Sequence, residues 1–270
     1  MKTCMFCGPT DEKITKEHVW SAWISEILKP TMEGDTFTTM RYKGGTEVEH
    51  QWEAGEIDLQ VKDLCKPCNN VWLGSEFEGP IIKPLLVDVI AHAKLALWSA
   101  QEQADIAAWC YKMALVLEYA SGKQIWFTDE ERREFRRTRA AHPFISIRMA
   151  KYDFSNDGIF KASHSYSAVQ QLKAQKSDFN VEVKLTTISA GFFAFQVVAV
   201  RNLATGQLID VRELGEIEFS PQAAASLKQL WPLVGRNALW PPSLSLNHKD
   251  LIDLSEMWAK AHQALPDPPA

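Results

Sequence analysis

Cys4-Met-Phe-Cys7, near the start of the chain, and Cys65-Lys-Pro-Cys68, further along, are two tight cysteine pairs of equal spacing. Each pair presents two sulfur atoms from one short turn, and four thiolates together suit a closed tetrahedral zinc site. Cys7 and Cys65 are separated by 57 residues, which is tolerable because the entropic cost of closing a loop grows slowly with its length. We therefore predict one structural zinc ion. Its ligands would be Cys4, Cys7, Cys65 and Cys68.

The alternative is that these are four unrelated buried thiols. Against it, isolated cysteines seldom occur twice in pairs of the same spacing. Cys110, the fifth cysteine, stands alone among apolar residues and is expected to be a small buried hydrophobic side chain. Because the N-terminal residues lack the apolar segment of a signal peptide, we expect a cytoplasmic protein. In a reducing compartment, paired cysteines indicate metal ligands rather than disulfides.

An acid–histidine dipeptide, Glu17-His18, lies between the two cysteine pairs, and Asn69 directly follows the second pair. Carboxylate and amide oxygens are the ligands that a hard cation such as Mg²⁺ prefers. A histidine titrates close to neutral pH and can remove a proton from water. Such a dipeptide also occurs in solvated loops, which is the alternative interpretation. Its position between two predicted zinc-binding pairs, with Asn69 beside the second, favours a catalytic role.

The order of these motifs resembles the HNH (ββα-metal) endonucleases, in particular the zinc-stapled kind in which the last asparagine directly follows the last cysteine. The resemblance covers residues 4–78 and implies an N-terminal zinc-bound ββα-metal module. It also implies three roles: Glu17 is the acidic metal ligand, His18 is the general base, and Asn69 is the second ligand of a catalytic divalent cation.

One position departs from the family pattern. The family's middle asparagine, which orients the general base, has no counterpart in this chain. Asp58, Gln60 and Asp63 occupy the corresponding stretch. The side-chain carbonyl of Gln60 could hold the histidine instead.

The resemblance implies a divalent-metal-dependent endonuclease that hydrolyses phosphodiester bonds of nucleic acid, with DNA favoured over RNA. Zn²⁺ would be the structural cofactor, and Mg²⁺ or another divalent cation the catalytic one. The alternative is a non-catalytic protein whose zinc-bound region is a scaffold for binding nucleic acid or another protein, which the missing asparagine favours. No apolar run reaches the length of a membrane span, so we expect no membrane partner.

The distribution of charge limits where phosphates could bind. The net charge is −5, and residues 1–79 carry 8 basic against 14 acidic residues, so phosphate binding would depend on local cations. The basic stretch is residues 123–151, with 8 basic against 4 acidic residues. Arg132, Arg136 and Arg139 would share one face of a helix there. That helix is either solvated and paired with its own glutamates, or in contact with phosphates.

Hydrophobic periodicity predicts an α+β fold of two domains, residues 1–79 and residues 80–270. The first would be the zinc-bound module, with inserted strands at 36–42 and 47–52. The second would be a helical segment and an antiparallel sheet with C-terminal helices, of unknown recognition role. Helices are expected at 85–99, at 104–120, from a capping box at Thr128 onward, at 220–230 and at 247–264. Strands of the sheet are expected at 144–149, 158–162, 181–185, 192–200 and 208–211.

Overall fold

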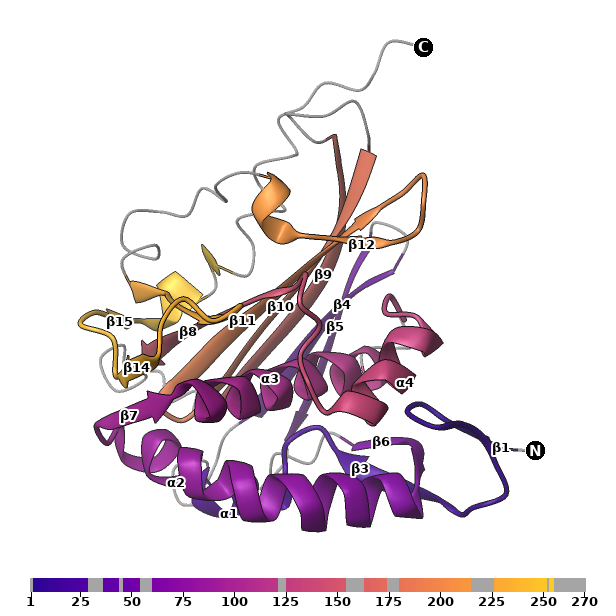
Figure 1. Cartoon of the computed structure of the whole chain (residues 1–270), viewed down its shortest axis with the longest axis horizontal. Coiled ribbons are helices and arrows are strands. Elements are labelled where there is room, and N and C mark those ends of the chain that lie inside the picture. The colour runs from indigo at the N-terminus through magenta and orange to yellow at the C-terminus, as the bar shows by residue number, and fades with distance from the viewer. Residues whose placement is uncertain are drawn as a thin grey trace.

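One long helix, α3 (Ala100–Ala120), runs between an N-terminal region that carries the cysteine pairs and a C-terminal sheet (Figure 1). The structure is a computed structural model that describes residues 2–28, 36–43, 46–53, 60–120, 125–153, 163–173, 180–214, 226–251 and 253–254. From Ile106 to Glu118 every residue of α3 is buried, as expected of a helix covered on all sides. The predicted α+β class is confirmed.

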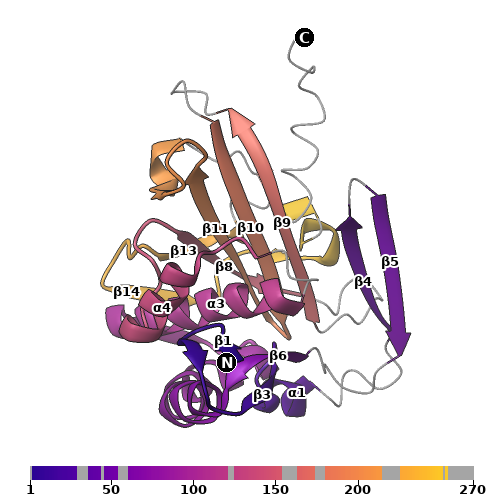
Figure 2. The ribbon, with the colours of Figure 1, turned by 90° about the vertical axis from the view of Figure 1, so that its right-hand side faces the viewer.

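The N-terminal region consists of short strands and helices. β1 (Lys2–Cys4) pairs with β2 (Gly8–Thr10), and β3 (Ile14–His18) pairs antiparallel with β6 (Gln60–Cys65). Between β3 and β6 the chain forms α1 (Ala22–Leu28) and a hairpin of β4 (Thr36–Lys43) and β5 (Thr46–Glu53), which lies at the right of Figure 2. β6 leads into helix η2 (Pro67–Ile82), and α2 (Lys83–His92) follows.

Helix η2 is wound more widely than an α-helix, with π-type hydrogen bonding. Its buried side chains recur every five residues, at Trp72, Phe77 and Ile82. A neighbouring buried row contains Cys68, Leu73 and Glu78. Because hydrogen bonds in a π-helix join residues five apart, this period keeps both rows on the same inward side. The winding therefore brings Cys68 to the cysteine cluster while Glu78 faces the interior.

The C-terminal sheet has the strand order β13-β8-β11-β10-β9, with antiparallel neighbours throughout. These strands are β8 (Ser146–Tyr152), β9 (Ser163–Lys173), β10 (Asn180–Ala190), β11 (Phe193–Asn202) and β13 (Lys228–Trp231). Short strands extend it: β12 (Leu208–Ile209) pairs with β11, and β15 (Ser245–Leu246) runs parallel to β8. The remaining elements are β7 (Ala96–Ser99), which pairs with β14 (Asn237–Trp240), helix α4 (Asp129–Thr138) and the 3₁₀ turn η3 (Val211–Leu214).

A glycine turn ties the sheet to α2. Gly191, between β10 and β11, has a φ of +52°, and a Cβ atom there would lie 2.2 Å from the carbonyl oxygen of Ile90. The N–H of Phe192 donates to that same oxygen at 3.0 Å. Only glycine meets both requirements, the positive φ and the close approach of two backbones.

The large hydrophobic core cluster spans the two predicted domains. It includes Phe6 and Leu64 from the N-terminal strands, Trp109 from α3, and Phe195 and Trp240 from the C-terminal strands. The expected boundary between residues 79 and 80 falls inside η2. Among the described residues, no helix is both long and apolar enough to cross a lipid bilayer.

Most of the predicted elements are confirmed. The helix expected at 104–120 is α3, and Thr128 opens α4 with the predicted capping box. The strands expected at 36–42, 47–52, 144–149, 181–185, 192–200 and 208–211 correspond to β4, β5, β8, β10, β11 and β12. The strand expected at 158–162 and residues 255–264 of the last helix lie outside the described residues.

Two predicted helices are wrong in part. The helix expected at 85–99 ends at His92, because Ala93 adopts a left-handed conformation, and the chain then forms β7. Pairing of β7 with β14 buries Trp98, which stacks on Trp240. The helix expected at 220–230 is replaced from Lys228 by strand β13, which pairs with β8. In both segments, tertiary pairing overrides the local helical pattern.

Candidate metal centre and the strand beside it

The four paired cysteines come together as predicted. Cys4 ends β1, Cys7 lies in the β1–β2 turn, Cys65 ends β6, and Cys68 lies in the first turn of η2. Their sulfur atoms all lie within 4.8 Å of one another. The Sγ atoms of Cys7 and Cys65 are 3.6 Å apart, close to the roughly 3.8 Å that tetrahedral Zn–S bonds of about 2.3 Å require. Four protein sulfurs fill such a site, so a metal bound here would be structural.

Backbone contacts around the cluster fix its geometry. The N–H of Cys65 donates to the Sγ of Cys4 at 3.3 Å, and the N–H of Met5 donates to the carbonyl of Asp63 at 2.8 Å. These bonds join the β1 turn to β6. Cys110 is not part of the cluster and is fully buried in α3, as expected from the sequence.

The four thiols differ in their ionisation. A hydrogen bond from the Cys68 side chain lowers the pKa of Cys4 to about 4, while burial raises the pKa of Cys7 to about 12. The same bond to Cys4 raises the pKa of Cys68, an effect that a hydrogen bond from Arg136 opposes. Within this group, the hydrogen bond from Cys68 therefore favours the thiolate form of Cys4. A bound metal would supply the positive charge needed to deprotonate its neighbours.

Glu17 is buried and paired with a cation from α3. Its Oε1 accepts a hydrogen bond from the Lys112 ammonium at 3.0 Å, and Lys112 also lies 3.0 Å from Glu78 Oε1. Trp109 Nε1 donates to that oxygen of Glu78 at 3.2 Å. Burial raises the pKa of Glu17, and the charge of Lys112 opposes this. Burial alone would lower the pKa of Lys112, but the charges of Glu78 and Glu17 raise it, so Lys112 remains charged.

Asn69 links the first turn of η2 to β3. Its side-chain amide nitrogen donates to Thr15 Oγ1 at 3.0 Å and to the carbonyl oxygen of Lys16 at 2.9 Å. The Lys16 carbonyl can only accept, so the amide nitrogen must face it. This arrangement leaves Asn69 Oδ1 as the atom that could bind a cation.

His18 is the last residue of β3 and is half-buried. Gln60 lies directly opposite on β6, the residue that could replace the family's middle asparagine. Successive side chains of a strand alternate between its two faces, so Glu17 and His18 leave β3 on opposite sides. Thus Asn69 contacts β3 at Thr15 and Lys16, whereas Glu17 and His18 are its last two residues. The carboxylate of Glu17 lies in the interior.

Sequence reasoning missed the buried network in which Glu17 pairs with Lys112, Lys112 with Glu78, and Glu78 with Trp109. Lys112, Glu78 and Trp109 are far from Glu17 in the chain, and none carries a recognisable motif. The signal that could have found them is the charge of Lys112 and Glu118 within the apolar stretch of α3 from Ile106 to Glu118. A buried charge must be paired.

The interpretation of α4 as a phosphate-contacting helix is wrong for Arg132. This side chain is fully buried and donates to Glu118 Oε2 at 2.9 Å. Arg136 lies 4.6 Å from the centroid of the Trp72 ring, and Arg139 pairs with Glu76 at 3.0 Å. The predicted arginine face is therefore turned toward the protein, and the fully solvated interpretation fails for it as well.

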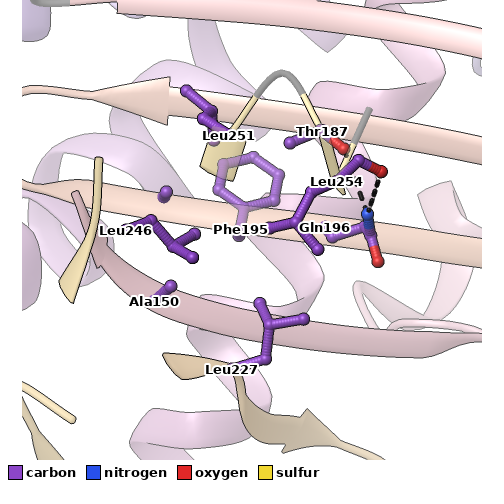
Figure 3. A pocket seen from close by; sticks show the side chains of 9 residues that line it. Ala150, Thr187, Phe195, Gln196, Leu227, Leu246, Leu251 and Leu254 are labelled. Atoms are coloured by element: carbon purple, nitrogen blue, oxygen red, sulfur yellow. Dashed lines mark hydrogen bonds between the residues drawn. The ribbon is translucent and has the colours of Figure 1, made fainter. Parts of the chain in front are cut away.

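A space beside β15 has no character of a ligand site. Figure 3 shows Leu246, Leu251 and Leu254 near Ala150 and Gln196. The space between these side chains is too narrow to admit a water molecule. The amide of Gln196 donates to the carbonyl of Leu254 at 3.3 Å. We regard it as a packing defect between the sheet and the last described residues.

No protein family, curated protein or solved structure matches the chain.

Proposed function

We propose that the N-terminal region is a metal-dependent endonuclease module that hydrolyses phosphodiester bonds of nucleic acid, with DNA favoured over RNA as the substrate. The observation that carries the proposal is the hydrogen bonding of Asn69, which ties the start of η2 to the strand of Glu17 and His18. A strand pair followed by a helix and held by four cysteines is the arrangement that the resemblance to the HNH endonucleases implies.

In this proposal, Glu17 and Asn69 hold a divalent cation such as Mg²⁺ through oxygen atoms. Glu17 uses Oε1 for Lys112 and keeps Oε2, and Asn69 offers Oδ1. Two carboxylates and one ammonium, from Glu17, Glu78 and Lys112, leave a net negative charge that attracts a cation. When bound, the cation stabilises negative charge on the phosphate and on the leaving oxygen.

His18 would act as the general base. It would take the proton from the attacking water, the role that histidine most often has in general acid–base catalysis. Its half-buried position at the end of β3 leaves it within reach of solvent. Gln60, directly across the strand pair, is the residue placed to orient its ring.

The test is a plasmid-nicking assay with zinc-loaded protein and added Mg²⁺. Wild-type protein should convert supercoiled plasmid to the nicked form, and His18→Ala should abolish the conversion while retaining zinc and thermal stability. His92→Ala is the matched control, because His92 is an exposed histidine at the end of α2. Equal nicking by wild type and His18→Ala would reject the assignment of the base.

The second candidate function is a non-catalytic, zinc-scaffolded binding protein. The specific observation that favours it is the ion pair between Glu17 and Lys112, which already neutralises the proposed metal ligand. The side chains of Glu17 and His18 also lie on opposite faces of β3, which favours the non-catalytic candidate. This candidate predicts that zinc-loaded wild-type protein leaves plasmid intact at every Mg²⁺ concentration.

A further inference from the structure

Four lysines are exposed on the strand pair that carries His18. Lys13 and Lys66 flank the end near the zinc cluster and are joined by a backbone hydrogen bond of 2.9 Å. Lys16 and Lys62 lie within β3 and β6. We call the group of Lys13, Lys16, Lys62 and Lys66 the hairpin lysines.

A shift in strand register determines the face of the strand pair on which the side chains of Lys16 and Lys62 lie. Between Thr15 and Glu17 the single residue Lys16 lies opposite two residues, Lys62 and Asp63, which is a β-bulge. Glu17, Val61 and Leu64 are buried on the inner face. Alternation from these residues places Lys16 and Lys62 on the outer face, the face of His18.

The hairpin lysines have no partner within the described part of the chain. None of the four forms an ion pair or side-chain hydrogen bond with a described residue. The carboxylates within β3 and β6 are Glu17, which is paired with Lys112, and Asp63, which is half-buried. Asp11 and Glu12 are exposed before Lys13, outside the strand pair. A local excess of positive charge therefore remains on the outer face.

We propose that the hairpin lysines bind the phosphate backbone of nucleic acid and hold it along the outer face of β3 and β6, next to His18. The choice of nucleic acid among polyanions rests on the proposed function. The net charge of −5 does not oppose this, because at physiological ionic strength charges more than about 8 Å away are largely screened. A lysine ammonium is a flexible, strongly hydrated point charge that suits contacts to phosphate without reading sequence.

The test measures binding rather than cleavage. Zinc-loaded wild type, the double variant Lys16→Gln/Lys62→Gln and two single controls are titrated against a labelled DNA duplex without added divalent cation. Fluorescence anisotropy is recorded from about 50 to 200 mM salt, the range over which phosphate contacts dominate the change in affinity. The double variant should lose about two units of the salt slope, so its affinity should fall about tenfold less than that of wild type across this range.

The controls separate position from charge. Lys83→Gln removes an exposed lysine just beyond the far end of η2 from Asn69, and Arg137→Gln removes an exposed arginine that is paired with Glu134. Both should keep the wild-type slope. Zinc content and thermal unfolding should be the same for all variants, because none of these side chains is buried.

An unchanged salt slope in the double variant, or no measurable binding by wild type, overturns the proposal. Equal competition by polyglutamate or by anionic vesicles also overturns it, since the partner would then be an acidic protein or a membrane. Parallel titrations with single-stranded DNA and with RNA identify the nucleic acid that binds most tightly. If the double variant loses its salt slope while wild type cuts no plasmid, the binding surface stands and only the proposed cleavage fails.

Discussion

The arginines of α4 and the hairpin lysines are two basic groups of this chain that differ in their surroundings. By sequence, α4 is the basic segment and the N-terminal region is acidic. In the structure, Arg132, Arg136 and Arg139 contact Glu118, Trp72 and Glu76. The hairpin lysines contact no described carboxylate. Charge that the fold has already paired is not available to a ligand, so a basic segment in the sequence need not be a basic surface.

The chemistry of the two side chains explains the division. Guanidinium is planar, weakly hydrated and able to stack on aromatic rings, so it is well suited to buried pairs. The ammonium of lysine keeps its water shell at less cost when it remains exposed. Lys112 and Lys184 are buried all the same, because Glu17 and Glu78 lie 3.0 Å from Lys112 and Glu118 lies 3.5 Å from Lys184.

The largest expected effect comes from the cysteine cluster, which lies next to both basic groups. Arg136 of α4 donates a hydrogen bond to Cys68, and Lys66 lies between Cys65 and Cys68. Cys68→Ser should lower the zinc content and remove much of a folding contribution on the order of 10 kcal/mol. The N-terminal strands should unfold at a lower urea concentration than the C-terminal sheet. Zinc analysis and urea titration followed by hydrogen exchange measure both changes.

Cys110→Ser is the matched control for that variant. Cys110 is equally buried but lies outside the cluster, so zinc content should be unchanged and only a modest loss of stability is expected. Equal zinc loss in both variants would remove the distinction between the cluster and the fifth cysteine.

The second effect compares the two basic groups directly. Arg132→Met should destabilise the fold by about 3 kcal/mol, the lower end of the range for breaking a buried pair. The lower end applies because Lys184 remains 3.5 Å from Glu118. Lys62→Gln should change the free energy of unfolding by less than about 0.5 kcal/mol, as is usual on a surface. Urea unfolding of both variants checks this, and similar values would break the comparison.

The sequence predicted what depends on local spacing and missed what depends on packing. The cysteine cluster, α3 and the capping box of α4 follow from short-range patterns, and the structure contains them. The burial of Arg132 and the pairing of Glu17 with Lys112 depend on packing between separate elements, so the sequence could mark only the charges that need a partner and not the partners themselves. The same holds for β7, which becomes a strand only because β14 lies beside it.

A third prediction uses Lys112, a lysine that is buried and ion-paired, as Arg132 of α4 is. Lys112→Met removes the ammonium that opposes the rise in the pKa of Glu17, so burial should raise this pKa further. The folded variant then binds a proton at pH values where the unfolded chain has released it. Its stability should therefore fall as the pH rises from about 5 to 8, by up to about 1.4 kcal/mol per pH unit relative to wild type.

Urea unfolding at several pH values measures this slope. Lys62→Met is the control, because an exposed lysine without a carboxylate partner should leave the slope at its wild-type value. If Lys112→Met gave that value too, the ion pair with Glu17 would not govern the ionisation of this carboxylate.

The smallest expected effect tests whether the guanidinium itself matters on α4. Arg136 lies over the ring of Trp72 at 4.6 Å and also reaches Cys68. Arg136→Lys keeps the positive charge but loses the planar group that covers the ring, so stability should fall by about 0.5–1 kcal/mol. Arg137→Lys is the control, since this exposed arginine contacts only Glu134 among the described residues and the exchange should leave stability unchanged. A loss confined to Arg136→Lys in thermal unfolding would support an internal role for the arginine face. If both variants showed the same thermal stability, Arg136 would count as a surface charge. The contrast with the hairpin lysines would then depend on Arg132 and Arg139.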